Sequence, residues 1–155
     1  MNLDSFSDFR DGLSMTRLEF HALRDLPDKR ITADIAFKTS AATGSNLTFD
    51  NVAVENSLGV EVIMNGTFKP GIPTVTYNFY VRSQGPICRV CVNGTFHGEG
   101  GRTHKHELRD EADQRLNLPT VLPRPELENL SPREVWNKLM QDAKIVHTGI
   151  FIDPV

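Results

Sequence analysis

The sequence has no segment of the kind that directs a chain to a membrane. No run approaches the roughly 20 apolar residues that a spanning helix needs. Residues 1–6 carry neither the positive charge nor the apolar stretch of a signal peptide. Cysteine is also scarce, with only Cys88 and Cys91 in the chain. We therefore predict a cytoplasmic protein with reduced thiols and no membrane partner.

A surplus of basic residues is missing as well. The 17 lysines and arginines are outnumbered by 20 aspartates and glutamates, giving a net charge of −3. Domains that bind nucleic acid over a broad surface are usually basic, so this balance leaves room only for a local basic patch. The hydrophobic fraction of 39% and the length of 155 residues predict a single globular domain, 1–155. Within it we expect a loosely ordered N-terminus (1–13) and an extended or irregular connection (108–130).

The familiar nucleotide-binding and catalytic signatures are absent too. The chain has no P-loop, dinucleotide fingerprint, kinase signature or nucleophile elbow. Residues 98–101, Gly-Glu-Gly-Gly, resemble a phosphate cradle only in composition, because no good helix follows to add its dipole. We therefore expect no cofactor.

The patterns that are present predict an α+β fold. Residues 15–26 have apolar side chains at helical spacing, after a good N-cap at Ser14. The sequence Ser-Pro-Arg-Glu at 131–134 combines an N-cap, a proline at N1 and a glutamate at N3, so a second helix is expected at about 132–143. Apolar residues recur with period two in several segments between the helices. Short turns favour antiparallel pairing, so we expect an antiparallel sheet of about five or six strands over residues 31–107, with both helices packed on one face.

The sequence Asn-Gly-Thr-Phe occurs twice, at 65–68 and at 93–96. Asn-Gly is the strongest short signal for a hairpin turn, because both residues tolerate positive φ. Only the second copy is followed by histidines. We interpret the repeat as two strands with similar ends and not as a duplicated half-domain.

The second copy opens the stretch that is richest in titratable residues. Three of the five histidines, His97, His104 and His106, fall within ten residues. In an extended segment His104 and His106 point to the same face, and His97 lies across a glycine-rich loop. If the loop doubles back, His97 and His106 could serve as general base and acid in phosphodiester chemistry, with His104 orienting them. Arg89 and Arg102 would then hold the anion.

Other interpretations of the same cluster stay open. The histidines could be a solvated polar loop, or His97, His104 and His106 could hold Zn²⁺ with an open fourth position, although no metal is favoured. Cys88 and Cys91 have C-x-x-C spacing, but no second pair exists, and a strand sends positions i and i+3 to opposite faces. We expect buried, reduced cysteines, with a zinc site of one cysteine plus histidines as the lesser alternative.

The residues Cys-Arg-Val-Cys-Val-Asn-Gly-Thr-Phe-His, followed by Arg-Thr-His-Lys-His, resemble a pattern of small uncharacterised prokaryotic proteins. In that pattern an arginine-bearing strand and a polar-Gly turn precede one histidine and then a His-x-His. Some of those proteins resemble members of toxin–antitoxin or phage-defence gene pairs. The resemblance covers about residues 75–107 and implies that Arg89, His97, His104 and His106 are the site residues.

The leading hypothesis is a cytoplasmic bacterial or phage-type protein whose His/Arg cluster acts on phosphodiester or nucleotide substrates, in a toxin–antitoxin or defence context. RNA or a nucleotide would be the substrate, and a protein partner is expected. The alternative is a non-enzymatic interaction module, such as an inhibitor or antitoxin-like protein, that works through an acidic surface. Residues 110–113 and the N-terminal Asp4, Asp8 and Asp11 would support it. A further alternative is a His-ligated metal-dependent hydrolase, so whether the protein is an enzyme is left open.

Overall fold

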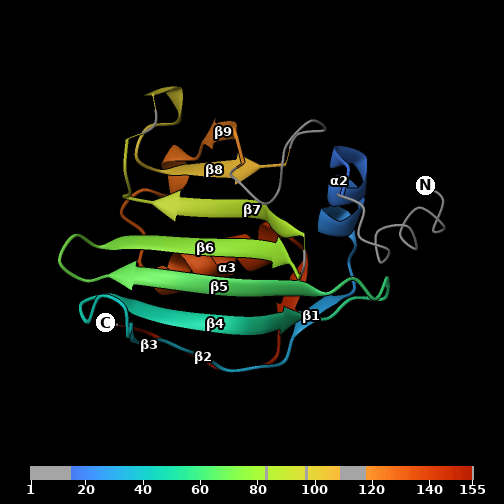
Figure 1. Ribbon diagram of the computed structural model, residues 1–155, viewed down its shortest axis with the longest axis horizontal. Coiled ribbons are helices and arrows are strands. Elements are labelled where there is room, and N and C mark those ends of the chain that lie inside the picture. The colour runs from blue at the N-terminus through green and yellow to red at the C-terminus, as the bar shows by residue number, and fades with distance from the viewer. Residues whose placement is uncertain (1–14, 83, 97, 109–117, 155) are drawn as a thin grey trace.

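A seven-stranded antiparallel sheet forms the centre of the computed structural model, which describes residues 15–82, 84–96, 98–108 and 118–154 (Figure 1). Its strands follow one another in chain order, as the short turns predicted. They are β3 (Lys38–Thr39), β4 (Leu47–Val54), β5 (Val62–Lys69), β6 (Thr74–Val81), β7 (Gly85–Val92), β8 (His104–Glu107) and β9 (Thr120–Pro123). The predicted α+β class is therefore confirmed, and the predicted strand count was low.

Four short strands pair between segments that lie far apart in the chain. The segment 31–38, in which apolar residues recur with period two, is divided among β1 (Lys29–Ile31), β2 (Ile35–Ala36) and β3. Two strands near the C-terminus, β10 (Ile145–His147) and β11 (Phe151–Ile152), pair in parallel with β1 and β2. The connection 108–130 contributes β9 to the main sheet and a 3₁₀ turn, η2 (Pro125–Leu127). Residues 1–14 and 109–117, for which loose or irregular structure was expected, lie outside the described part of the chain.

Both helices carry the caps that stabilise their first turns. Helix α2 (Arg17–Asp25) begins with a capping box between Thr16 and Glu19, so the N-cap is Thr16 and not Ser14. Helix α3 (Pro132–Asp142) begins after Ser131, whose hydroxyl accepts a hydrogen bond from the backbone N–H of Glu134. No helix in the described residues is long and apolar enough to cross a membrane.

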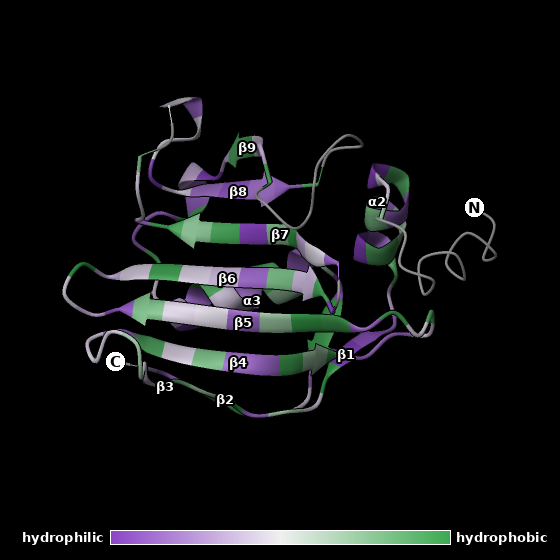
Figure 2. Ribbon diagram, viewed as in Figure 1, coloured by the Kyte–Doolittle hydropathy of each residue, from purple (hydrophilic) through white to green (hydrophobic). Residues whose placement is uncertain are grey.

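Helix α3 packs behind the middle of the sheet, and α2 stands beyond one end of it (Figure 1). The buried ring of Trp136 on α3 contacts Phe49, Tyr77 and Phe151, with ring centroids 5.3–6.1 Å apart. The Tyr77 hydroxyl donates to the Pro132 carbonyl over 2.7 Å, which fixes the start of α3 against the sheet. Figure 2 shows the central strands banded by alternating hydrophobic and hydrophilic residues. We call the face that packs on α3 the rear face, and the other the front face.

Candidate functional site

The pairing of β7 with β8 brings four reactive side chains together on the front face. Cα partners across this antiparallel pair are Arg89 with His106 and Cys91 with His104. Residues directly opposite each other project to the same side of a sheet, and residues two apart share that side. The expectation that His104 and His106 share a face is therefore confirmed, and Lys105 between them points to the other face.

The two histidines are buried and held in defined orientations. His104 and His106 are 1% and 2% exposed, and their rings meet edge to face with centroids 4.8 Å apart. Nδ1 of His104 lies 3.1 Å from the Gly101 carbonyl oxygen, and Nδ1 of His106 lies 3.0 Å from that of Leu118. A carbonyl can only accept, so Nδ1 is the donor in both rings. In the neutral imidazoles the lone pair is therefore on Nε2.

Cys91 completes a set of three metal-ligating side chains. Its sulfur and one nitrogen from each of His104 and His106 all lie within 4.8 Å of one another. Zinc binds sulfur at about 2.3 Å and imidazole nitrogen at about 2.0–2.1 Å, so tetrahedral ligands lie roughly 3.3–3.7 Å apart. Side-chain movements of about 1 Å would bring the three ligand atoms to the separation that one zinc ion requires. Hydrogen bonds from the far ring nitrogen to carbonyls are also the usual support for histidine ligands.

The pocket around these residues is rich in cations and hydroxyl groups. It has a volume of about 230 Å³ and lies over strands β5, β6, β7 and β8. Beyond Arg89 and the three metal-ligating residues, it is lined by Thr67, Lys69, Thr74, Thr76, Gly94 and Thr95. None of these described lining residues is acidic, in a protein whose acidic residues outnumber the basic ones. The pocket therefore favours an anion with several acceptor oxygens.

Burial and the neighbouring polar groups have opposite effects on the pKa of the Cys91 thiol. Burial raises its pKa above the usual value, and the Arg89 guanidinium opposes that effect, as do hydrogen bonds with Thr76 and Arg89. Cys88 lies on the rear face, where full burial raises the pKa of its thiol to about 11. The two cysteines diverge, as the strand spacing predicted, and only Cys91 faces the histidines.

The loop between β7 and β8 sets the strands in register. The Asn93 backbone turns with φ of 56°, and the N–H of Gly94 donates to the Arg102 carbonyl over 2.8 Å. The 3₁₀ turn η1 (Gly98–Gly100) then packs against His104 and β9. A Cβ on Gly100 would lie 2.3 Å from Cγ1 of Val121, so any larger residue there would force Val121 or the turn to move.

The structure places the other predicted residues as follows. Arg89 lines the pocket, half-buried, beside Cys91 and the histidines. Arg102 is exposed and is not among the described lining residues. His97 lies outside the described residues. Cys91 was not among the predicted site residues, and the signal for it was present, since alternation from Arg89 places it on the same face.

No protein-family model, no curated protein and no solved structure matches the chain.

Proposed function

We propose that the protein is a metal-dependent hydrolase of phosphate esters, with Zn²⁺ held by Cys91, His104 and His106 and with Arg89 binding the phosphate. The single observation that carries the proposal is the convergence of three ligand atoms within 4.8 Å on the front face, beside a cation. Three protein ligands leave the fourth tetrahedral position open, as in catalytic zinc sites.

The hydrogen bonds to Nδ1 orient both rings in a way that suits metal ligands. General acid–base catalysis requires one imidazole that accepts a proton and one that donates it. His104 and His106 both donate from Nδ1 to carbonyls, so in the neutral state both present Nε2 as an acceptor. Two aligned acceptors beside a thiol suit a cation. The metal-free hypothesis, with His97 and His106 as base and acid, stays a second proposal.

The chemistry of the pocket supports a phosphate ester as the substrate. Zinc lowers the pKa of a bound water to about 7 and so supplies hydroxide at neutral pH. Arg89 lies opposite His106 across the strand pair and can hold phosphate oxygens through two parallel N–H groups. The neighbouring threonine hydroxyls and Lys69 add further donors.

The biological context of the reaction is proposed from the resemblance around residues 75–107. It suggests a toxin–antitoxin or defence gene pair, a phosphodiester or nucleotide substrate, and a protein partner. We propose these as the setting for the hydrolase.

Metal content tests the proposal first. We expect wild-type protein to hold about one zinc per chain by mass spectrometry of the metal, and His106→Ala to hold almost none. His21→Ala is the matched control, because His21 is half-buried on α2 and lines neither described pocket. A wild-type protein that takes up no zinc, or a His106→Ala variant that keeps it, would refute the metal site.

Activity tests the second half of the proposal separately. Hydrolysis of bis(4-nitrophenyl) phosphate should require zinc, and Arg89→Gln should lower kcat/KM about 100-fold, the usual effect of losing one preorganised donor. Zinc content should not change in Arg89→Gln. Full activity in that variant would remove Arg89 from the phosphate-binding role while leaving the metal site intact.

A further inference from the structure

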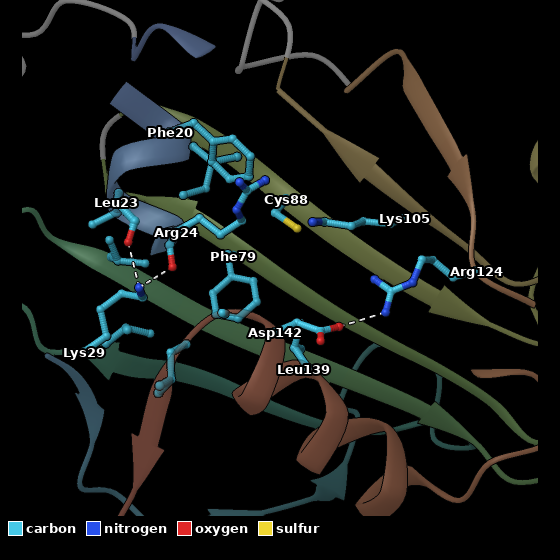
Figure 3. Close-up of a pocket in the computed structure, with 15 residues that line it drawn as sticks. Phe20, Leu23, Arg24, Lys29, Phe79, Cys88, Lys105, Arg124, Leu139 and Asp142 are labelled. Atoms are coloured by element: carbon cyan, nitrogen blue, oxygen red, sulfur yellow. Dashed lines mark hydrogen bonds and ion pairs between the residues drawn. The ribbon is translucent and has the colours of Figure 1, made fainter. Parts of the chain in front are cut away.

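The rear side of the same strand pair contains a second pocket, between α2, α3 and the sheet (Figure 3). Its volume is about 60 Å³, against about 230 Å³ for the front pocket, which is room for a few waters or a short hydrocarbon chain. Its lining is mostly apolar and comes from both helices and from five strands of the fold: Phe20, Leu23, Val54, Val62, Phe79, Ile87, Cys88, Leu139, Ala143 and Ile145.

Three cationic side chains lie over this apolar lining. Arg24 comes from α2, Lys105 from β8 and Arg124 from the turn after β9, and Figure 3 shows their charged ends directed toward the same space. Lys29 also lines the pocket, but its ammonium donates to the carbonyls of Leu23, Arg24 and Leu26 over 2.6–2.7 Å. Lys29 therefore caps the C-terminal end of α2. The other three cations are the ones that can contact a ligand in the pocket.

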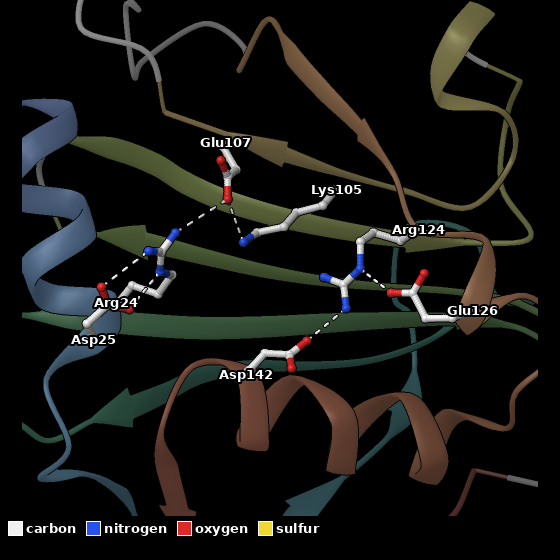
Figure 4. A network of polar contacts seen from close by, with 7 residues as sticks. All are labelled: Arg24, Asp25, Lys105, Glu107, Arg124, Glu126 and Asp142. Carbon is white, nitrogen blue, oxygen red and sulfur yellow. Dashed lines mark hydrogen bonds and ion pairs between the residues drawn. The ribbon is translucent and has the colours of Figure 1, made fainter.

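Most acidic partners of these cations are more exposed to solvent than the cations themselves. The side chains of Arg24, Lys105 and Arg124 are 14–31% exposed, and Glu107, at 8%, is shared by Arg24 and Lys105 over 3.8 and 2.6 Å (Figure 4). The remaining partners, Asp25, Glu126 and Asp142, are 47–54% exposed. Exposed ion pairs contribute little, about 0–1 kcal/mol. All three cations are therefore ion-paired, and the partners that a ligand could displace at small cost are the exposed ones, Asp142 above all, which itself lines the pocket.

We propose that this rear pocket binds a small amphipathic carboxylate, with its hydrocarbon part against Phe79 and Leu139 and its carboxylate between Lys105 and Arg124. The exposed carboxylate of Asp142, which accepts from Arg124 over 2.8 Å, occupies the place of the ligand's anion and would give it up at small cost. A carboxylate fits because it is planar and pairs with arginine through two N–H groups. The proposal does not depend on the zinc site, since it uses the opposite face of β7 and β8.

The experiment uses a series of straight-chain carboxylates from butanoate to octanoate, titrated into full-length protein and followed by calorimetry. Each methylene that enters the pocket should tighten binding about fourfold until the chain outgrows the space. Octylammonium, of equal length and opposite charge, should bind at least tenfold more weakly than octanoate. Stripping the zinc beforehand keeps carboxylates from binding a metal on the front face.

Two variants locate the binding. Arg124→Gln should weaken octanoate about tenfold, and Ala143→Leu should abolish binding by filling the pocket without changing any charge. Arg89→Gln, on the opposite face, is the control and should bind octanoate like wild type. The proposal fails if folded wild type shows no binding at millimolar octanoate. It also fails if octylammonium binds equally well, or if Arg124→Gln and Ala143→Leu both leave the affinity unchanged.

Discussion

The front and rear faces of the β7–β8 pair have different chemistry, although alternating residues of the same two strands form both. The front face presents Arg89, Cys91 and the two oriented histidines to a polar pocket. The rear face places Cys88 in the apolar core and pairs Lys105 with Glu107 over 2.6 Å. The role of a side chain in these strands therefore depends on the face to which it points, which alternates from one residue to the next, more than on its position along the strand. The first three predictions below test one face against the other.

The two cysteines should give the largest difference. Cys91→Ala is expected to weaken zinc binding more than about 100-fold, since losing even an outer-shell partner costs 10- to 100-fold. Cys88→Ala should keep the metal and lower the free energy of unfolding by about 1 kcal/mol, because it removes buried core volume. Zinc competition titrations and denaturant unfolding measure the two quantities. Equal metal affinities in the two variants would contradict the assignment of Cys91.

Two glycines provide the next comparison, because a Cβ would collide at 2.3 Å in both: with Val121 at Gly100, and with Phe49 at Gly66. Each Gly→Ala change should cost about 1–3 kcal/mol of stability through overpacking. Gly100→Ala should also weaken zinc binding, since η1 packs on His104, whereas Gly66→Ala on the rear face should not. Thermal unfolding with and without zinc separates these effects. An unchanged zinc affinity in Gly100→Ala would show that η1 does not position the histidine.

The carboxylate of Glu107 should matter for the rear face alone. Glu107→Gln removes the charge shared by Lys105 and Arg24 and leaves two half-buried cations close together. We expect a loss of about 1–3 kcal/mol, as for buried hydrogen bonds to charged groups. Zinc content should stay at the wild-type value, although Glu107 follows His106 directly in sequence. Loss of zinc would indicate that the two faces are not independent.

The smallest effect is a pH dependence that belongs to Lys29. Burial lowers the pKa of this ammonium from 10.5 to about 8 in the folded protein. Between these values the unfolded chain binds more protons, so this group makes the protein more stable as pH rises from about 8 to 10.5. Lys29→Met should lack that rise. The free energy of unfolding is measured between pH 8 and 10.5 for wild type and for the variant. The same increase in both proteins would show that Lys29 is not its source.

Local signals predicted the parts of the fold that local interactions stabilise. Helix α3 was expected at about 132–143 and runs from Pro132 to Asp142, because its cap lies in the sequence itself. The two Asn-Gly copies show the limit of such signals. Asn93 does take a positive φ and turns the chain, whereas Asn65 and Gly66 continue through the middle of β5, where the Phe49 ring packs over Gly66. The same dipeptide has two outcomes because its neighbours in space differ.

The candidate site shows the same division. Period two predicted that His104 and His106 share a face and that Cys88 and Cys91 do not. It did not predict which strand faces the histidines, so Cys91 was assigned to the core instead of the site. The carbonyls of Gly101 and Leu118 that orient the rings are also backbone groups, on which the residue pattern carries no information.

By itself, the sequence determined the two helices, the antiparallel order of the strands and the side of each strand to which a residue points. These features follow from backbone geometry and from contacts within a few residues. The tertiary structure alone decided the register that sets Cys91 opposite His104 and Arg89 opposite His106, and the parallel pairing of the C-terminal strands with β1 and β2. Both depend on how loops close and on packing between segments far apart in the chain, where a one-residue slip would send every side chain to the other face.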